Sequence, residues 1–179
     1  MKIEDFVGKS IGAWKSMRSG HSLAFQQFEE IRSTINITLV DKDEPILQEM
    51  LENYKLKQKK ISSPFSMSWE AESDWDYHEK ASLSSGSTLL VPIPVTPQNG
   101  IILRSQGYFE AIKATSKYQL LSDQTLILHT EYEETIAEER IWFLNDNVRC
   151  RASVIKATKT SGILQTSFAS EIRQLNNQI

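Results

Sequence analysis

Alternation of apolar and polar residues dominates the chain and predicts β-strands. Successive side chains of an extended strand point to opposite faces, so strict alternation gives one face for the core and one for solvent. The strand-like segments are also rich in β-branched and aromatic residues, and they cover residues 34–40, 65–72, 108–115, 125–132, 139–143, 148–155 and 163–172. The pattern therefore indicates a mainly β protein.

Turn residues separate these segments. The breaks are rich in Asn, Asp, Gly and Ser, which favour chain reversal, and they fall at residues 98–100, 122–123, 145–147 and 161–162. All five prolines lie between residues 45 and 97, so the later part of the chain is free to form long paired strands. Many strands in hairpin succession predict an all-β fold, an antiparallel meander that closes into a barrel.

One segment follows a helical pattern instead. Asp43-Glu44-Pro45 provides a start, because proline is tolerated in the first turn of a helix. Apolar residues then recur at helical spacing on one face, at Ile46, Leu47, Met50, Leu51 and Tyr54. We expect this helix to pack on the barrel as a lid or plug. A short N-terminal helix over residues 3–7 has weaker support from the sequence.

Composition excludes several classes of protein. A chain of 179 residues has the usual size of one domain, which we expect to span residues 1–179. The net charge of −3 gives no basic signature for nucleic acid. Cys150 is the only cysteine, which excludes an internal disulfide and a cysteine-based zinc site. The chain lacks an apolar run long enough for membrane insertion, and its N-terminus lacks a signal-peptide core, so a cytoplasmic location is expected.

The most informative segment is residues 148–153, where charged and apolar residues alternate. Arg149, Arg151 and Ser153 share one strand face and are spaced about 6.6 Å apart. Glu139 precedes a turn and can pair with this row across a hairpin. The segment can form a polar cavity wall or an exposed face with cross-strand ion pairs. Cys150 lies on the opposite face, where a structural thiol is favoured over a reactive one.

Tryptophans provide a second set of candidate positions. Gly12 and Trp14 form a Gly-x-Trp motif that resembles the lipocalin signature, in which the indole closes one end of the barrel and a late arginine stacks over it. Arg173 is a candidate for that arginine, because guanidinium on indole is a favourable cation–π pair. Trp69 and Trp75 can be ordinary core and loop aromatics, or flat surfaces for a conjugated ligand.

Four motifs occur in order along nearly the whole chain: WKSMRSGH from residue 14, EERIWF at 138–143, VRCRAS at 148–153 and SFASEIR at 167–173. Together they resemble the S-type phycobiliprotein lyases, the CpcS/CpeS family. The resemblance implies a lipocalin-like, antiparallel up-and-down barrel of about ten strands, with one or two short helices and no metal or nucleotide cofactor. The bound phycobilin, phycoerythrobilin or phycocyanobilin, is then a substrate. The enzyme delivers it to a cysteine of an apo-phycobiliprotein subunit and a thioether forms.

The resemblance also implies site residues. Arg149 and Arg151, with Ser153, suit the two propionates of a bilin, and Arg18 is a third candidate. Glu139 and Glu171 can accept hydrogen bonds from pyrrole N–H groups, and a carboxyl with a pKa raised by a dry site can protonate the bilin. His21 is a candidate proton-transfer partner near the mouth. The further candidates for contact with the bilin are Trp14, Trp69 and Trp75.

Two questions stay open at this point. A simple core rule puts the apolar face of 148–154 inside the barrel. The resemblance instead puts the arginines inside and requires a cover for the apolar face, such as a helix or the partner in a homodimer.

The alternative function is a non-catalytic carrier of a bilin, haem or fatty acid. The segment SMRSGHSLAFQQFEE is similar to the phycoerythrin-type branch, which favours phycoerythrobilin and a phycoerythrin-type acceptor over a phycocyanin-type one.

Overall fold

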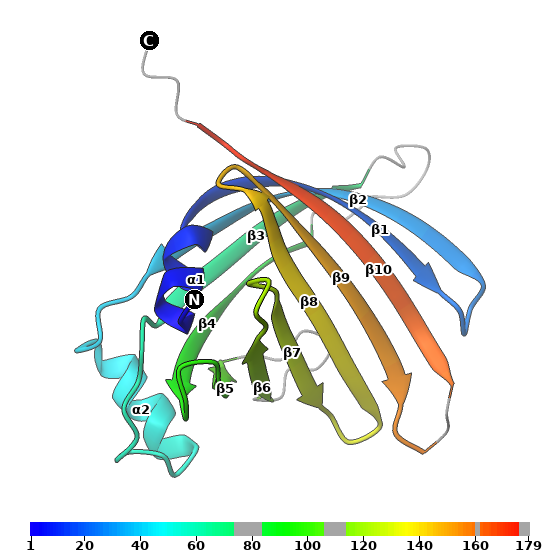
Figure 1. Ribbon diagram of the computed structural model, residues 1–179. Coiled ribbons are helices and arrows are strands. Elements are labelled where there is room, and N and C mark those ends of the chain that lie inside the picture. Colours follow the sequence, from blue (N-terminus) through cyan, green and yellow to red (C-terminus); the bar gives the residue numbers. More distant parts are fainter. Residues whose placement is uncertain (74–83, 106–113, 160–161, 176–179) are drawn as a thin grey trace.

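The computed structural model describes residues 1–73, 84–105, 114–159 and 162–175. Within them, ten antiparallel strands form a closed barrel (Figure 1). Each strand pairs with its neighbours in the sequence, and β1 closes the ring against β10. The strands are β1 (Gly12–Ser22), β2 (Gln27–Leu39), β3 (Phe65–Ser73), β4 (Ser84–Pro94), β5 (Asn99–Arg104), β6 (Ala114–Leu120), β7 (Leu126–Glu131), β8 (Thr135–Asn145), β9 (Val148–Ala157) and β10 (Ile163–Arg173). The predicted up-and-down barrel is confirmed.

The pattern analysis missed β4 and β5, and its segment at 108–115 overlaps β6 only at the first two residues of that strand. Pro92 and Pro94 argue against a strand, because proline cannot donate to a sheet ladder. In the structure Pro94 lies at the end of β4, and the carbonyl of Pro92 accepts a hydrogen bond from the Ser62 N–H at 2.8 Å. The expected strand over 108–115 lies largely outside the described residues.

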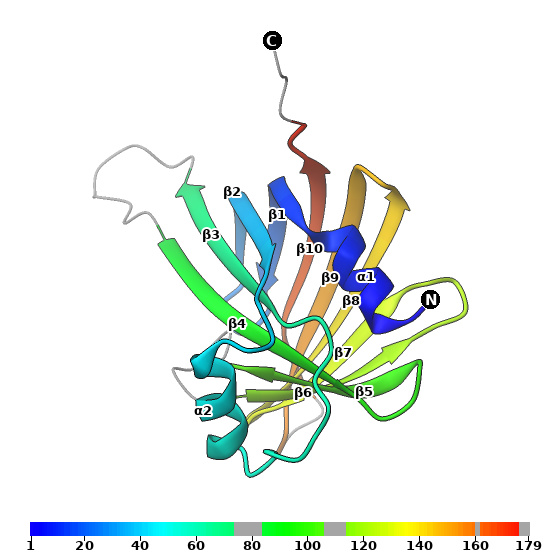
Figure 2. The same ribbon diagram turned by 90° about the vertical axis from the view of Figure 1, so that its left-hand side faces the viewer.

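Both expected helices form, but the one that begins at Pro45 does not lie where it was expected. Helix α1 (Ile3–Ser10) lies at one end of the barrel and buries Ile3, Phe6 and Val7 in the main hydrophobic core (Figure 2). Helix α2 (Pro45–Asn53) packs outside the wall of β4 and β5. The prediction that the α2 segment is a lid or plug is therefore wrong, and α1 plugs the barrel.

Helix α2 lies outside because β4 and β5 are apolar on both faces. Val91, Ile93 and Leu103 point outward, and they form a second buried cluster with Leu47, Met50 and Leu51 of α2. Leu90 and Ile102, one position away, point inward to the main core. A strand pair that is apolar on both faces needs a cover on its outer face, and α2 provides it. Neither helix in the described ranges is long and apolar enough to cross a membrane.

Trp14 fixes the closed end of the barrel, where α1 lies. Its side chain is fully buried, and its indole Nε1 donates a hydrogen bond to the Ser10 carbonyl at 2.9 Å. The guanidinium of Arg173 lies 4.2 Å from the centre of the indole, which confirms the expected stacking. Arg173 also donates hydrogen bonds to the carbonyls of Lys9 and Ile11 at the end of α1. These contacts connect α1, β1 and β10 at one point.

Gly12 makes room for this arrangement, and its replacement gives the first prediction. Gly12 has a φ of +123°, and a Cβ there would lie 2.8 Å from Nη1 of Arg173. We therefore expect Gly12→Ala to lower the free energy of unfolding by about 1–3 kcal/mol, the usual cost of a strained backbone position. Urea denaturation followed by circular dichroism measures this change.

Gly8 provides the matched control, because it lies within α1 and an added Cβ would meet nothing within 4 Å. Gly8→Ala should raise the free energy of unfolding by up to about 1 kcal/mol, because alanine favours helix. Equal stability of the two variants would contradict the role given to Gly12.

Candidate functional site

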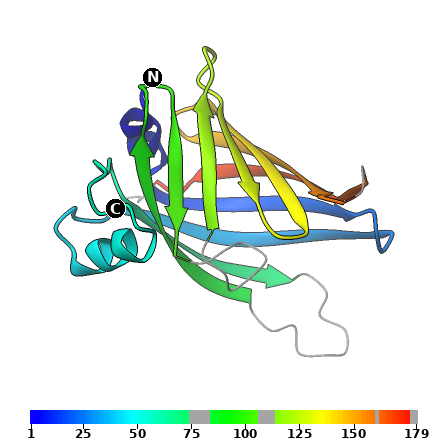
Figure 3. The same cartoon turned by 90° about the horizontal axis from the view of Figure 1, so that it is seen from below.

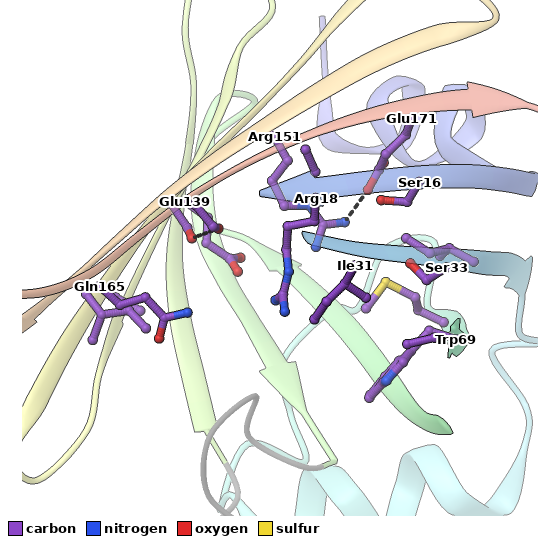
Figure 4. Close-up of a pocket in the computed structure, with 17 residues that line it drawn as sticks. Ser16, Arg18, Ile31, Ser33, Trp69, Glu139, Arg151, Gln165 and Glu171 are labelled. Carbon is purple, nitrogen blue, oxygen red and sulfur yellow. Dashed lines mark hydrogen bonds and ion pairs between the residues drawn. The ribbon is translucent and has the colours of Figure 1, made fainter. Parts of the chain in front are cut away.

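A cavity of about 300 Å³ lies inside the barrel, and it is the candidate site (Figure 4). Strands β1, β2, β3, β8, β9 and β10 all contribute to its wall. Its polar lining consists of Ser16, Arg18, Ser33, Glu139, Arg151, Ser153, Gln165, Ser167 and Glu171. Its apolar lining consists of Ile31, Ile35, Met67, Trp69, Ala71, Ala137, Ile155 and Ala169. A wall of this mixed kind suits an amphipathic organic ligand.

The cavity has a closed inner end and a more exposed outer end. Glu171 and Ser16 lie toward the Trp14 end, and both are buried. Arg18, Ile31 and Gln165 lie farther along their strands, and all three are partly exposed. The more exposed end of the cavity therefore lies beside the turn that joins β1 and β2, at the end of the barrel opposite to α1.

Strand β9 turns its charged face to the interior. Arg151 and Ser153 line the cavity, and Arg149 is 2% exposed near the closed end. Cys150 lies on the other face, where its register partners are Trp142 and Ser170. The simple core rule fails here because Glu139 and Glu171, from the neighbouring strands, provide counter-charges inside the barrel.

Glu171 is the most buried of these charges, with 1% of its side chain exposed. It accepts a hydrogen bond from Nε of Arg149, and its other oxygen lies 3.4 Å from Nη2 of Arg151. Burial by itself raises the pKa of Glu171, but attraction to Arg151 and Arg149 together with the hydrogen bond from Arg149 outweighs it. The pKa is therefore below its ordinary value of 4.5.

Glu139 has a different cationic partner. Nη2 of Arg104 donates a hydrogen bond to Glu139 at 3.2 Å, and the two side chains are 5% and 12% exposed. Burial by itself raises the pKa of Glu139. Attraction to Arg104 and Arg151, together with the hydrogen bond from Arg104, outweighs this effect, so the pKa of Glu139 is lower than its ordinary value. The expectation of a raised carboxyl pKa is wrong for Glu139 and Glu171, because arginines that the sequence does not place beside them keep both ionised.

The sign of these shifts decides their effect on stability. A carboxyl whose pKa is lower in the folded than in the unfolded state stabilises the fold at pH values above its pKa in the unfolded state. The contribution of Glu139 and Glu171 is therefore complete above about pH 4.5 and is lost as the pH falls through their folded values.

Arg104 is a site residue that sequence reasoning missed. It ends β5 after an apolar run, and its only signal is a lone charge on the inward-facing side of that strand. With it, the interior charges near the closed end among the described residues are three cations and two carboxylates, namely Arg104, Arg149, Arg151, Glu139 and Glu171. One positive charge is left in excess. Nε of Arg104 and Nη2 of Arg149 are buried without a hydrogen-bond partner among the described residues.

Arg149 lies beneath the cavity, although the sequence suggested a place in its wall. Its guanidinium lies 4.7 Å from the centre of the Trp14 indole, and it does not line the main cavity. Trp14 is likewise at the closed end and fully buried. Both residues therefore support Glu171 from below, and neither is placed to contact a ligand in the cavity directly.

At the outer end, Arg18 and Trp69 are placed on the cavity wall (Figure 4). Arg18 donates a hydrogen bond to Glu29 at 3.0 Å, and its side chain is 27% exposed. The indole of Trp69 lies directly over Gly86, where an added Cβ would approach within 2.4 Å of the ring. Gly86 therefore allows Trp69 to lie back against the wall. Ser153 shares a 2.7 Å hydrogen bond with Ser167.

Another predicted residue, His21, is not brought to the cavity. His21 is exposed on the outer face of β1, where its ring centre lies 5.0 Å from that of Phe28. Strand alternation explains this placement, because Arg18 points inward and His21 is three positions away. Trp75 lies outside the described residues. Within the described ranges, no group of three or more His, Cys, Asp or Glu residues could hold a metal ion.

Comparisons with known proteins identify the family of the chain. The family model described as CpeS-like protein matches residues 2–174. Chromophore lyase CpcS/CpeS 3 of Trichodesmium erythraeum is 47% identical over 97% of this chain and 99% of the relative. A putative phycoerythrobilin lyase CpeS of Microchaete diplosiphon is 40% identical over 98% of this chain and 79% of the relative.

A solved structure shows the same fold at moderate sequence identity. It is the S-type phycobiliprotein lyase CPES from Guillardia theta, which superposes with a TM-score of 0.84 at 36% identity and covers 99% of this chain and 95% of its own. The solved structure agrees with the barrel, and the family model and the full-length relatives match nearly the whole chain. The chain belongs to the CpcS/CpeS family of chromophore lyases.

Proposed function

We propose that the cavity binds one phycobilin and presents it for thioether formation with a cysteine of an apo-phycobiliprotein subunit. The observation that carries this proposal is the excess positive charge at the inner end of an otherwise mixed cavity. A bilin combines a flat conjugated body with two propionates. The propionate supplies the missing negative charge, and the conjugated body suits the wall at Trp69.

Arg151 is the residue proposed to bind a propionate at the inner end. It lines the cavity, is 14% exposed, and is held near Glu171 at 3.4 Å. A guanidinium presents several N–H donors in one plane and can bind a carboxylate with two of them. Arg18, near the mouth, is proposed to meet the second propionate or a ring carbonyl.

Glu139 and Glu171 are proposed to face the pyrrole nitrogens as ionised groups. Their lowered pKa values make them poor proton donors at neutral pH, so their role differs from that of a general acid. A fixed carboxylate instead raises the pKa of a nearby bilin nitrogen and stabilises the protonated tetrapyrrole. The positive charge on the bilin makes its ring A a better electrophile.

The chemistry is then an addition of a thiol to a double bond. The sulfur of the acceptor cysteine bonds to the ethylidene side-chain carbon of ring A, and a proton is added to the ring carbon of the former double bond. No oxidant or reductant is needed. A cavity of about 300 Å³ is at the low end of the range for ligand sites, so ring A would extend to the mouth, where another protein can reach it.

Phycoerythrobilin is the bilin we propose first. The support is the 40% identity to a relative whose name is putative phycoerythrobilin lyase. A phycoerythrin-type subunit is then the expected acceptor.

The proposal extends to assembly and location. The outer wall near Cys150 exposes Met17, Phe168 and Ile172, and a second copy of this chain in a homodimer would cover them. A monomer in sedimentation velocity would contradict the dimer.

The single cysteine is a buried free thiol, which fits a reducing compartment such as the cytoplasm.

Arg151→Ala tests the proposed propionate contact. We expect the variant to bind phycoerythrobilin about 1.5–3 kcal/mol more weakly, the usual range for a lost hydrogen bond to a charged group, and to label an apo-subunit more slowly. Arg151→Lys should restore binding only in part, because lysine lacks the planar fork. Absorption titration and acid-stable labelling of the acceptor measure the two effects.

Arg140→Ala is the matched control, because Arg140 is exposed on the outer face of β8 and pairs there with Glu138. Wild-type affinity in both alanine variants would rule out the propionate assignment. If the wild-type protein binds bilin but leaves the acceptor unlabelled, the chain is a non-catalytic bilin carrier.

Glu139→Gln tests the charge effect on the bilin. The wild-type carboxylate raises the pKa of the bound bilin nitrogens, so its removal should move their deprotonation to lower pH by about 1–3 pH units. At neutral pH the bound bilin should therefore absorb at shorter wavelength, and transfer should slow by about a hundredfold, the usual scale for loss of one electrostatically stabilising group. A pH titration of the absorption spectrum and the rate of labelling provide the readouts, with Glu138→Gln on the outer face as the control.

Cys150→Ser tests whether the enzyme itself carries the bilin. Burial and the nearby Glu171 raise the pKa of the Cys150 thiol, and its side chain faces away from the cavity. It is therefore a poor nucleophile in the wrong place, and the variant should keep most of the wild-type transfer rate. A folded variant that binds bilin without transferring it would instead support a covalent relay through Cys150.

A further inference from the structure

Apolar side chains gather on the hairpin that joins β1 and β2. Leu23, Phe25 and Phe28 are 50%, 76% and 61% exposed, and His21 packs against Phe28 with 5.0 Å between ring centres. Single exposed apolar residues are ordinary on a protein surface, but clustered ones indicate a contact site. Three such side chains and the ring of His21 lie within eight residues of sequence and form one group, which we name the mouth hairpin (residues 21–28).

The mouth hairpin lies at the entrance of the cavity. Gln165 lines the cavity, and its register partner Ser22 directly precedes the turn. The backbone N–H of Leu23 donates a hydrogen bond to the Leu164 carbonyl at 2.8 Å, which fixes the turn against β10. Figure 3 shows the hairpin projecting at the end of the molecule opposite to α1.

The established chemistry of the family requires a second protein at this entrance. A chromophore lyase must bring the reactive part of its ligand to an acceptor side chain, and the closed end is blocked by α1, Trp14 and Arg173. The acceptor must therefore approach the open end, where it meets the mouth hairpin.

The acceptor also has the complementary chemistry. A surface that encloses a conjugated tetrapyrrole is expected to be lined mainly by apolar and aromatic side chains. Exposed phenylalanines on the enzyme can cover such a surface around the acceptor cysteine. We propose that the mouth hairpin docks onto the apolar bilin-binding surface of the apo-phycobiliprotein subunit. This inference rests on the proposed function.

Phe25→Ser and Phe28→Ser, alone and combined, test the docking role. Neither side chain lines the cavity, so bilin affinity and the bound-bilin spectrum should remain at wild-type values. The KM for the apo-subunit in the transfer reaction should rise about tenfold for a single variant and more for the double variant, as for loss of an aromatic anchor of an interface. Circular dichroism checks the fold.

Val95→Ser is the matched control. Val95 is 77% exposed, close to the value for Phe25, and it follows β4 at the opposite end of the barrel. A photoreactive phenylalanine analogue at position 25 should crosslink to the apo-subunit, and the same analogue at position 95 should not.

The possible outcomes separate the two proposals. A wild-type protein that does not bind phycobilin would overturn the proposed function. Normal binding with an unchanged acceptor KM in the double variant would overturn the docking role alone. A change in oligomeric state with unchanged acceptor KM would assign the hairpin to self-association and would also overturn the docking role.

Discussion

Charges buried inside the barrel must be paired, and this requirement governs the arrangement of its interior. An isolated ionised group in a dry interior is strongly destabilising, whereas a paired and hydrogen-bonded one is tolerated. Glu171 is therefore held by Arg149 and Arg151, and Glu139 by Arg104. The Glu171 pairs join the neighbouring strands β9 and β10. The Arg104–Glu139 pair joins β5 to β8, which are not neighbours, so it forms only when the barrel folds.

The closed end of the barrel, where α1 lies, holds these buried charges in place. Trp14 contacts the guanidinium of Arg149 on the cavity side and that of Arg173 at the barrel end, and Arg173 holds the end of α1. This chain of contacts orients Glu171 without exposing it to water. The same barrel is less buried at its other end, so one structure combines a rigid charged base with an accessible mouth. That polarity is what a protein needs to hold a pigment at one end and present it at the other.

Much of the fold could be predicted from sequence because strand alternation and turn residues are local signals. The Trp14–Arg173 contact was also predictable, because the Gly-x-Trp motif implies a stacking arginine. The local pattern did not decide which face of β9 points inward. Val148 and Cys150 suit a hydrophobic core, and the arginines on the other face suit solvent. The resemblance to the family, and later the structure, resolved that choice.

The remaining errors have long-range causes. The pKa direction of Glu139 depends on Arg104, which is 35 residues away in sequence and carries no motif. The role of α1 depends on which end of the barrel is left open, and no short segment encodes that. The family resemblance implied both Arg18 and His21 as site residues, although their side chains point to opposite faces of β1.

The most direct test of the account is a crystal structure of the protein with bound phycoerythrobilin. The account predicts a propionate within hydrogen-bond distance of Arg151, pyrrole nitrogens facing Glu139 or Glu171, and ring A at the mouth beside the hairpin of β1 and β2. A bilin bound on the outer wall, or one inserted with ring A toward Trp14, would contradict it.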